Sequence, residues 1–337
     1  MKIDLKKILA IQTYSGQEWR TFAHCVRVAK SLNANVRQDK SGNLYIVKGK
    51  SKTFPCVVAH LDSVHAIGSD LSILEHNGLL TGFNRSTMQQ AGIGGDDKCG
   101  IYIALKCLEQ FENIKIAFFV DEERGCIGSS EADISFFNDC RFVLQADRRG
   151  NADFITNASG TELSSKDFQK AVQPYLALYG FKKENGMMTD VMTLKENGLK
   201  VSCANVSCGY FRPHSKDEYV NISDVENTLN LFYSIIKNLK EVYTHTYEPK
   251  KYGGYYGSYH SQDYWKRYDN PKGWKSKGNA KQSDLWSGKA VSETKHEERE
   301  NNLCEGCCNV SYSLTYYSSW NAWICKDCES WSKSSLR

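Results

Sequence analysis

Apolar and polar positions along the first 243 residues form patterns that predict strands and helices in turn. Near-continuous apolar runs at 54–59 and 114–120 are typical of strands that are buried on both faces of a sheet. Apolar, β-branched runs at 43–48, 141–146 and 201–206 predict further strands. Helical patterns lie between them, so we expect an α/β fold in which helices cover both faces of a mixed central sheet.

Three stretches carry the clearest helical signals. Residues 1–33 predict two helices interrupted at Ser15-Gly16, and residues 98–111 predict a third. The segment Ser223-Asp224-Val225-Glu226 matches a capping box, which predicts a helix that begins there and ends near Leu239.

The composition changes abruptly after residue 243 and divides the chain into three parts. Residues 1–243 form the expected α/β domain, with 29 Lys and Arg against 28 Asp and Glu. Residues 244–302 are rich in Tyr, Gly and Lys and follow neither a helical nor a strand period, which indicates a flexible linker. Within it, residues 250–289 hold nine basic side chains and three acidic ones, so positive charge is concentrated there. Residues 303–337 form a third, cysteine-rich unit.

Hydropathy and cysteine usage bear on the compartment. No apolar run approaches the roughly 18 residues that cross a bilayer, and the apolar stretch 8–11 is too short for a secretory signal. Eight of the 13 cysteines are scattered between Cys25 and Cys208, where buried reduced thiols are expected. We therefore expect a cytoplasmic protein that does not associate with membranes.

Imidazole and carboxylate side chains follow several of the predicted strands. In an open α/β sheet, loops that leave the carboxyl ends of strands gather at one edge and form ligand sites. Two imidazoles and several carboxylates are the mixture with which a protein holds a pair of divalent metals for hydrolysis. The segments are His60-Leu61-Asp62, Gly94-Gly95-Asp96-Asp97-Lys98, Asp121-Glu122-Glu123, Gln145-Ala146-Asp147 and His214-Ser215.

Each segment alone has a simpler explanation. Asp96 or Asp97 could cap the helix that starts near Lys98, and a single histidine more often fills a structural role. The acids after 116–120 are harder to dismiss, because three carboxylates directly after the most apolar strand need a compensating cation.

In their order along the chain, these motifs resemble the zinc-dependent exopeptidase clan. That clan includes peptidase T and the glutamyl and leucyl aminopeptidases with two co-catalytic metals. The resemblance spans about residues 5–240 and implies the α/β fold of those enzymes. The matching motifs are His60-Leu61-Asp62-Ser63, Gly95-Asp96-Asp97-Lys98, Glu122-Glu123-Arg124-Gly125-Cys126-Ile127-Gly128, Ala146-Asp147 and His214-Ser215-Lys216-Asp217-Glu218.

The resemblance implies two divalent metal ions, expected to be zinc, and it implies which residues bind each of them. Asp96 would bridge the two metals. His60 and Asp147 would complete the ligands of one metal, and Glu123 and His214 those of the other.

The resemblance also assigns roles to the neighbouring acids. Glu122 would be the general base, and Asp62 would hold His60 from behind. The Asp96–Asp97 peptide bond is expected to be cis. Asp97 and Asp190 are expected to support the site without binding metal.

The spacing of the motifs limits the architecture. His60 and Asp96 are 36 positions apart and Asp147 and His214 are 67 apart, so neither interval holds a lid domain of about a hundred residues. A single lidless catalytic domain favours an aminopeptidase of short peptides. Two alternatives stay open: an amidohydrolase that deacylates N-acyl amino acids, and an adaptor that binds nucleic acid or protein.

The C-terminal unit carries a second metal signal. Cys304-x-x-Cys307 and Cys325-x-x-Cys328, with seventeen residues between the pairs, predict a four-thiolate structural zinc in a ribbon-like module. The module could be purely structural, or it could recognise a partner. The interleaved aromatic and basic residues of the linker, as in Tyr264-Trp265-Lys266-Arg267, suit single-stranded nucleic acid, but they also suit a plain tether, which is the favoured interpretation.

Overall fold

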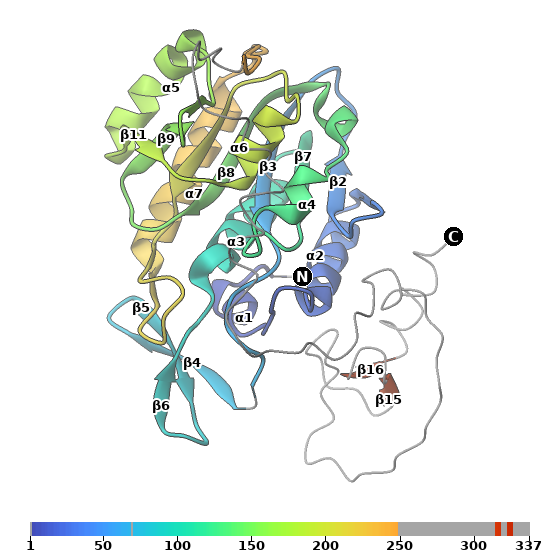
Figure 1. The fold of residues 1–337 in the computed structure, drawn as a ribbon, viewed down its shortest axis with the longest axis vertical. Helices are drawn as coiled ribbons and strands as arrows, with labels where there is room; N and C mark the ends of the chain where they lie inside the picture. The colour runs from blue at the N-terminus through green and yellow to red at the C-terminus, as the bar shows by residue number, and fades with distance from the viewer. Residues whose placement is uncertain (1, 69, 249–313, 318–321, 326–337) are drawn as a thin grey trace, which may run out of the picture.

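The computed structural model describes residues 2–68, 70–248, 314–317 and 322–325. Nine strands form a central mixed sheet (Figure 1). Their order is β1 (Asn35–Gln38), β2 (Leu44–Lys48), β7 (Ile114–Phe119), β3 (Phe54–His60), β8 (Cys140–Arg148), β12 (Cys203–Ser207), β9 (Asp153–Ala158) and β10 (Thr161–Glu162), with β11 (Lys182–Gly186) paired to β9.

The four strands in the middle of the sheet are parallel. Strand β3 runs parallel to both β7 and β8, and β12 runs parallel to β8. Antiparallel neighbours, β2 next to β7 and β9 next to β12, flank these four. The carboxyl ends of β7, β3, β8 and β12 therefore meet at one edge of the sheet, as parallel strands require.

Alternating residues of each central strand face two separate cores. In β3, Val57 and Ala59 belong to one core, while Cys56 and Val58 belong to the other. The sheet is thus covered on both faces, which confirms the predicted fold class. Helices α1 (Leu5–Leu9), α2 (Trp19–Ser31), α3 (Gly95–Gln110), α5 (Lys166–Tyr179) and α7 (Ile222–Asn238) supply the first core; η1 (Ile134–Phe137) and α6 (Asp190–Glu196), with α4 (Ile127–Ser130) packed against α6, cover the other face.

A second, smaller sheet was not predicted. Its order is β13 (Tyr210–Phe211), β14 (Tyr219–Asn221), β5 (Leu79–Asn84) and β4 (Leu71–His76), and β6 (Gln89–Ala91) pairs with β5. Strands β4, β5 and β6 project from the lower end of the body in Figure 1. They occupy the interval between His60 and Asp96, which is too short for a lid domain.

Most predicted elements are confirmed, with small shifts at their ends. The two N-terminal helices are separate, as expected from the break at Ser15-Gly16. Within α3, Asp96 and Asp97 have non-helical backbone angles, so regular helix starts near Lys98, as predicted. The strand expected at 201–206 is β12, which starts two residues later, and Val201 forms an isolated bridge with Thr244.

The capping box predicted at Ser223 is wrong. Helix α7 begins at Ile222, and its N-cap is Asn221, whose side chain accepts a hydrogen bond from the Ser223 amide at 3.0 Å. An asparagine is as good an N-cap as a serine, and here it lies two residues further upstream.

The predictions for the C-terminal third fall largely outside the described residues. Most of the linker and three of the four proposed zinc ligands, Cys304, Cys307 and Cys328, are not among the described residues. The described part of residues 303–337 is an antiparallel pair, β15 (Leu314–Tyr317) and β16 (Ala322–Cys325), which follows the first cysteine pair in sequence and ends at Cys325, the first residue of the second pair.

Two other expectations can be compared with the described residues. The eight cysteines from Cys25 to Cys208 are all buried and free. Among the described residues, no helix has both the length and the apolar character needed to cross a bilayer.

Candidate active site and metal centre

Three adjacent strands deliver side chains to the same edge of the sheet. Strand β3 ends at His60, β7 leads through Val120 into Asp121-Glu122-Glu123, and β8 carries Asp147 next to its last residue. Because β7, β3 and β8 are parallel neighbours, their carboxyl ends place these groups side by side.

Two further side chains reach the same place from loops. Asp96 comes from the glycine loop before the regular part of α3. His214 lies in the loop between β13 and β14, with φ of 61°, a left-handed conformation that is uncommon outside glycine. The small sheet thus has a role in the site, because two of its strands hold the His214 loop.

The structure brings all five proposed ligands together. The Nε2 atom of His60 lies 3.1 Å from Oδ1 of Asp96 and 3.6 Å from Oδ1 of Asp147. The Nε2 atom of His214 lies 3.3 Å from the other oxygen of Asp96 and 3.0 Å from Oε2 of Glu123. Asp96 therefore presents one oxygen to each histidine.

These contacts define two groups that share Asp96. The ligand atoms of His60, Asp96 and Asp147 lie within 4.8 Å of one another, and so do those of Asp96, Glu123 and His214. The second oxygen of Glu123 is buried without a hydrogen-bond partner among the described residues. A carboxylate oxygen left without a partner beside imidazoles and acids fits a metal ligand, so the residues present suit a pair of cations.

The charges of the site explain the ionisation of the shared ligand. Burial disfavours the ionised Asp96, but hydrogen bonds from His214 and His60 outweigh it and hold the pKa of Asp96 below its ordinary value. The same contacts with Asp96 and Glu123 raise the pKa of His214 to about 10. Burial and the nearby charge of Asp96 raise the pKa of Asp147 to about 7. The acids thus need positive charge nearby, which suits a site for divalent cations.

Glu122 lies next to the ligands without belonging to either group. Its Oε2 atom is 3.9 Å from Nε2 of His60, and its Oε1 atom accepts a hydrogen bond from the Cys126 thiol at 3.4 Å. Burial raises the pKa of Glu122 well above its ordinary value. A carboxylate with a raised affinity for protons, beside a metal centre, is suited to proton transfer.

Asp62 holds this side of the site together. Its Oδ1 atom lies 3.2 Å from Nδ1 of His60, and it accepts hydrogen bonds from the amides of Glu122 and Glu123. The hydroxyl of Ser15 donates to its second oxygen at 2.7 Å. Asp62 therefore orients one histidine and both glutamates.

Asp97 and Asp190 lie behind the ligands. The Asp96–Asp97 peptide bond is cis, and the carboxylate of Asp97 accepts the amides of His60 and Gly100. Asp190 is fully buried, and its Oδ2 atom accepts a hydrogen bond from the side-chain NH₂ group of Gln145, which also donates to Asp147.

Sequence comparison decides the family. The sequence profile described as peptidase family M28 matches residues 44–266, about two thirds of the chain. This chain belongs to peptidase family M28. It is therefore a metallopeptidase, and like other M28 peptidases it depends on metal. No match is found among curated proteins.

Solved structures with the same fold include aminopeptidases. The aminopeptidase PepT from Bacillus cereus is similar over 69% of this chain and 96% of its own, with 12% identity and a TM-score of 0.58. A tripeptidase from Staphylococcus aureus has the same coverage and identity, with a TM-score of 0.57. An aminopeptidase from the archaeon Desulfurococcus kamchatkensis has 15% identity, a TM-score of 0.55, and matches 70% of this chain and 94% of its own. These similarities confirm the fold expected for the M28 chain.

Four further residues of this M28 site were not named as site residues from the sequence. Gln145 and the Tyr210 hydroxyl donate to the two oxygens of Asp147, at 3.1 and 3.2 Å. Asn205 accepts the amide of Asp147, and buried Glu218 accepts the amides of Gly94 and Asp96. Only two carried a sequence signal: Gln145 precedes a ligand by two positions, and Glu218 closes the quoted motif that begins at His214.

Proposed function

We propose that this M28 chain is an aminopeptidase that uses two metal ions to remove residues from short peptides. The observation that carries the proposal is the position of Asp96, whose two oxygens face two different histidines, each with its own further acid. A carboxylate shared in this way supports a pair of metals rather than a single one.

The chain's own residues would hold the ions and handle the protons. His60 and Asp147 would hold one ion, Glu123 and His214 would hold the other, and Asp96 would serve both. When bound, two divalent ions, proposed to be zinc, lower the pKa of a shared water and stabilise the charge that develops on the carbonyl oxygen.

Glu122 would carry the proton between the two bonds that change. It accepts a proton from the attacking water as the oxygen bonds to the peptide carbonyl carbon. It then donates that proton to the leaving nitrogen as the C–N bond breaks. Asp62 keeps Glu122 in place through its amide and keeps His60 oriented through Nδ1.

The approach to the site is consistent with short peptides. His60 is buried with 1% of its side chain exposed, whereas His214 has 52% exposed, so a substrate reaches the ligands from the side of His214. Solved structures with this fold are named aminopeptidase and tripeptidase, which supports the same end preference. Deacylation of N-acyl amino acids would use the same groups and remains the second candidate.

The proposed base has a direct test. Glu122→Gln should abolish hydrolysis, because the amide cannot accept the proton of water, while metal content stays normal because Glu122 is outside both ligand groups. Glu241→Gln, at an exposed glutamate, is the control and should leave turnover unchanged. Chelation should inactivate the wild type, and zinc or cobalt should restore it. Unchanged turnover in Glu122→Gln would remove the base from the mechanism.

A substrate panel tests the reaction class independently. The metal-reconstituted protein is offered peptides with a free N-terminus and the same peptides with an acetylated one. An aminopeptidase cleaves only the free set, from the N-terminal end. Release of acetate or of acyl amino acids would favour the deacylase instead.

For the C-terminal unit, we propose one structural zinc held by Cys304, Cys307, Cys325 and Cys328. The described hairpin of β15 and β16 follows the first cysteine pair and ends at Cys325, an arrangement that supports this proposal. A nucleic-acid or protein partner of this unit and of the basic linker remains a proposal that rests on composition alone, as does a cytoplasmic location.

A further inference from the structure

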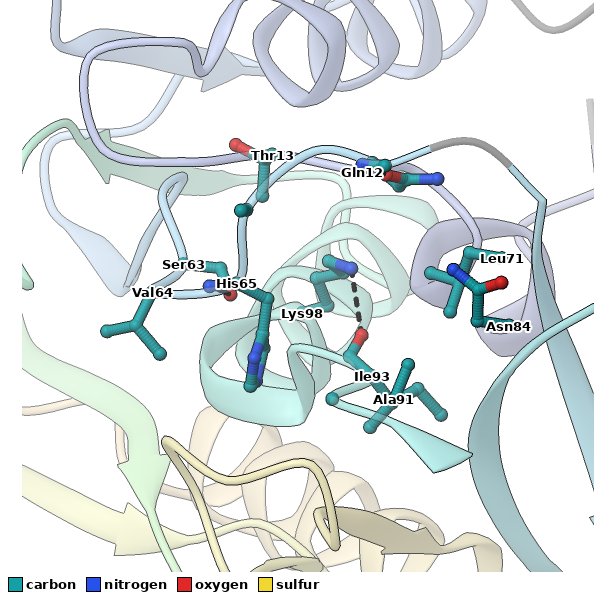
Figure 2. Close-up of a pocket in the computed structure, with 13 residues that line it drawn as sticks. Gln12, Thr13, Ser63, Val64, His65, Leu71, Asn84, Ala91, Ile93 and Lys98 are labelled. Carbon is teal, nitrogen blue, oxygen red and sulfur yellow. Dashed lines mark hydrogen bonds between the residues drawn. The ribbon is translucent and has the colours of Figure 1, made fainter. Parts of the chain in front are cut away.

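A cavity of about 260 Å³ lies where the small sheet meets the body, and the proposed chemistry leaves it unused (Figure 2). Its wall combines the segment after α1, the loop after β3, strands β4 to β6 and the first turn of α3. This volume suits the side chain of an amino acid or a small organic acid.

The polar groups of the wall are donors or neutral. The ionisable side chains that line the cavity are Lys98 and His65, and no carboxylate lines it within the described chain. In Figure 2, the side-chain amides of Gln12 and Asn84 lie on the opposite side of Lys98 from His65. The Oε1 atom of Gln12 accepts the amide of Gly68, so its NH₂ group is left to donate.

Lys98 is buried, and the carboxylate whose charge acts on it is that of Glu218, which lies outside ion-pair distance. Only 3% of the residue is exposed, and its ammonium donates to the carbonyls of Leu9 and Ile93, both at 2.9 Å. In the described part of the chain, no acidic oxygen lies within ion-pair distance of it. An ammonium has three N–H groups, so one remains, and Figure 2 shows Lys98 reaching toward the cavity. The oxygens of Glu218 bond to His65 and to the amides of Gly94 and Asp96, so the remaining N–H of Lys98 is left for an acceptor in the cavity.

His65, in the wall of the cavity, is linked by hydrogen bonds through Glu218 to the loop that holds Asp96. The Nε2 atom of His65 lies 2.7 Å from Oε2 of Glu218, and Glu218 accepts the amides of Gly94 and Asp96. An occupant of the cavity would therefore sit one side chain away from the backbone of Asp96.

We propose that this cavity binds a carboxylate group, with Lys98 as the cation and Gln12 as a further donor. Two sources share that chemistry. The carboxylate could belong to an acidic side chain of the peptide substrate, in which case the inference rests on the proposed function. It could also belong to a free small acid, in which case it does not.

Direct binding is tested without turnover. Glutarate is titrated calorimetrically into full-length protein from which chelation has removed the active-site metals, so that metal ligation cannot contribute. Leu71→Trp, which fills the cavity, should abolish binding, and Gln12→Glu, which adds a negative charge, should weaken it at least tenfold. Leu74→Trp is the matched control on β4, because Leu74 is exposed and outside the lining, and it should bind like the wild type. Glutaramide, which lacks the charge, should not bind.

The source is assigned by kinetics on the metal-loaded enzyme. If the substrate supplies the carboxylate, peptides that contain Glu should have a higher kcat/KM than their Gln counterparts, and Gln12→Glu should erase that ratio. If a free acid supplies it, the ratio is one in the wild type, and only glutarate binding responds to the variants. Absence of glutarate binding together with a ratio of one would overturn the inference, as would binding that both variants leave unchanged. Neither result would affect the test of Glu122.

Discussion

The carboxylate of Glu122 accepts a hydrogen bond from the thiol of Cys126, with Sγ 3.4 Å from Oε1. Cys126 is buried with 1% exposure and holds a left-handed backbone with φ of 55° at the start of α4. The thiol of Cys126 thus contacts the side chain of Glu122, and Asp62 accepts a hydrogen bond from the backbone amide of Glu122. We infer that Cys126 is a positioning residue that restricts the rotamers of Glu122.

Cys126→Ala should therefore lower kcat about tenfold and leave KM and metal content unchanged. The loss corresponds to about 1.4 kcal/mol, which is within the range of one intramolecular hydrogen bond. Cys126→Ser should recover most of the rate, because a hydroxyl can donate to the same carboxylate. Cys107→Ala, at another buried thiol on α3, controls for a general loss of packing. Equal kcat in Cys126→Ala and wild type would refute the positioning role.

The proposed ligands stand out in the sequence, but the residues that support them do not. His60, Asp96 and Asp147 follow predicted strands or a glycine loop in a recognisable order, so the local sequence is enough to single them out. Tyr210 and Asn205 support Asp147 from strands that lie more than fifty positions away. Hydrogen-bond partners at that separation depend on how the sheet is assembled, and no local pattern encodes them.

At the scale of elements, α2 contains a histidine that the fold keeps neutral. The Nε2 atom of His24 is buried without a hydrogen-bond partner among the described residues. Burial, aided by the charge of Arg27, lowers the pKa of His24 to about 4. Protonation of His24 is therefore disfavoured in the folded state relative to the unfolded state.

Acid should destabilise the protein through His24. Because the folded pKa lies below the unfolded value of about 6.5, the stability is full above pH 6.5 and falls as pH drops toward 4. Between pH 7 and pH 5 this one group should cost about 2 kcal/mol of unfolding free energy. Urea unfolding of wild type and His24→Phe at both pH values measures it. The variant should lose about 2 kcal/mol less than the wild type, and an equal loss in both would refute the assignment.

Short elements near the surface were the hardest to predict. The strands of the small sheet are three to six residues long where they project, and β4 has no buried residue along its length. Such strands lack the continuous apolar runs from which β3 and β7 were predicted. The start of α7 was misplaced for a related reason, because Asn221 competes with Ser223 as a cap and only the tertiary structure selects between them.

At the scale of the whole molecule, all the residues proposed for catalysis and for the active-site metals lie in the range from His60 to His214. The chain after α7 still pairs with the body for a few residues. The amide of Tyr243 donates to Arg141 and the amide of His245 donates to Lys200, while the Lys195 ammonium donates to the carbonyl of His245. Described contacts with the body thus continue past residue 243, where the composition changes.

Two truncations should separate the catalytic domain from the C-terminal unit. Removal of residues 249–337 should leave peptide hydrolysis intact and lower bound zinc from three ions per chain to two, because the four proposed cysteine ligands are lost with the segment. Removal of residues 241–337 should also cut the hydrogen bonds of Tyr243 and His245, and it should lower the melting temperature relative to the longer form. Metal analysis, thermal unfolding and peptide hydrolysis measure the three outcomes. If the longer truncated form retained all its zinc, the cysteine site would be wrong. If that form folded but lost hydrolysis, the active site would need residues from the C-terminal unit, and the assignment of the reaction to residues 60–214 alone would fail.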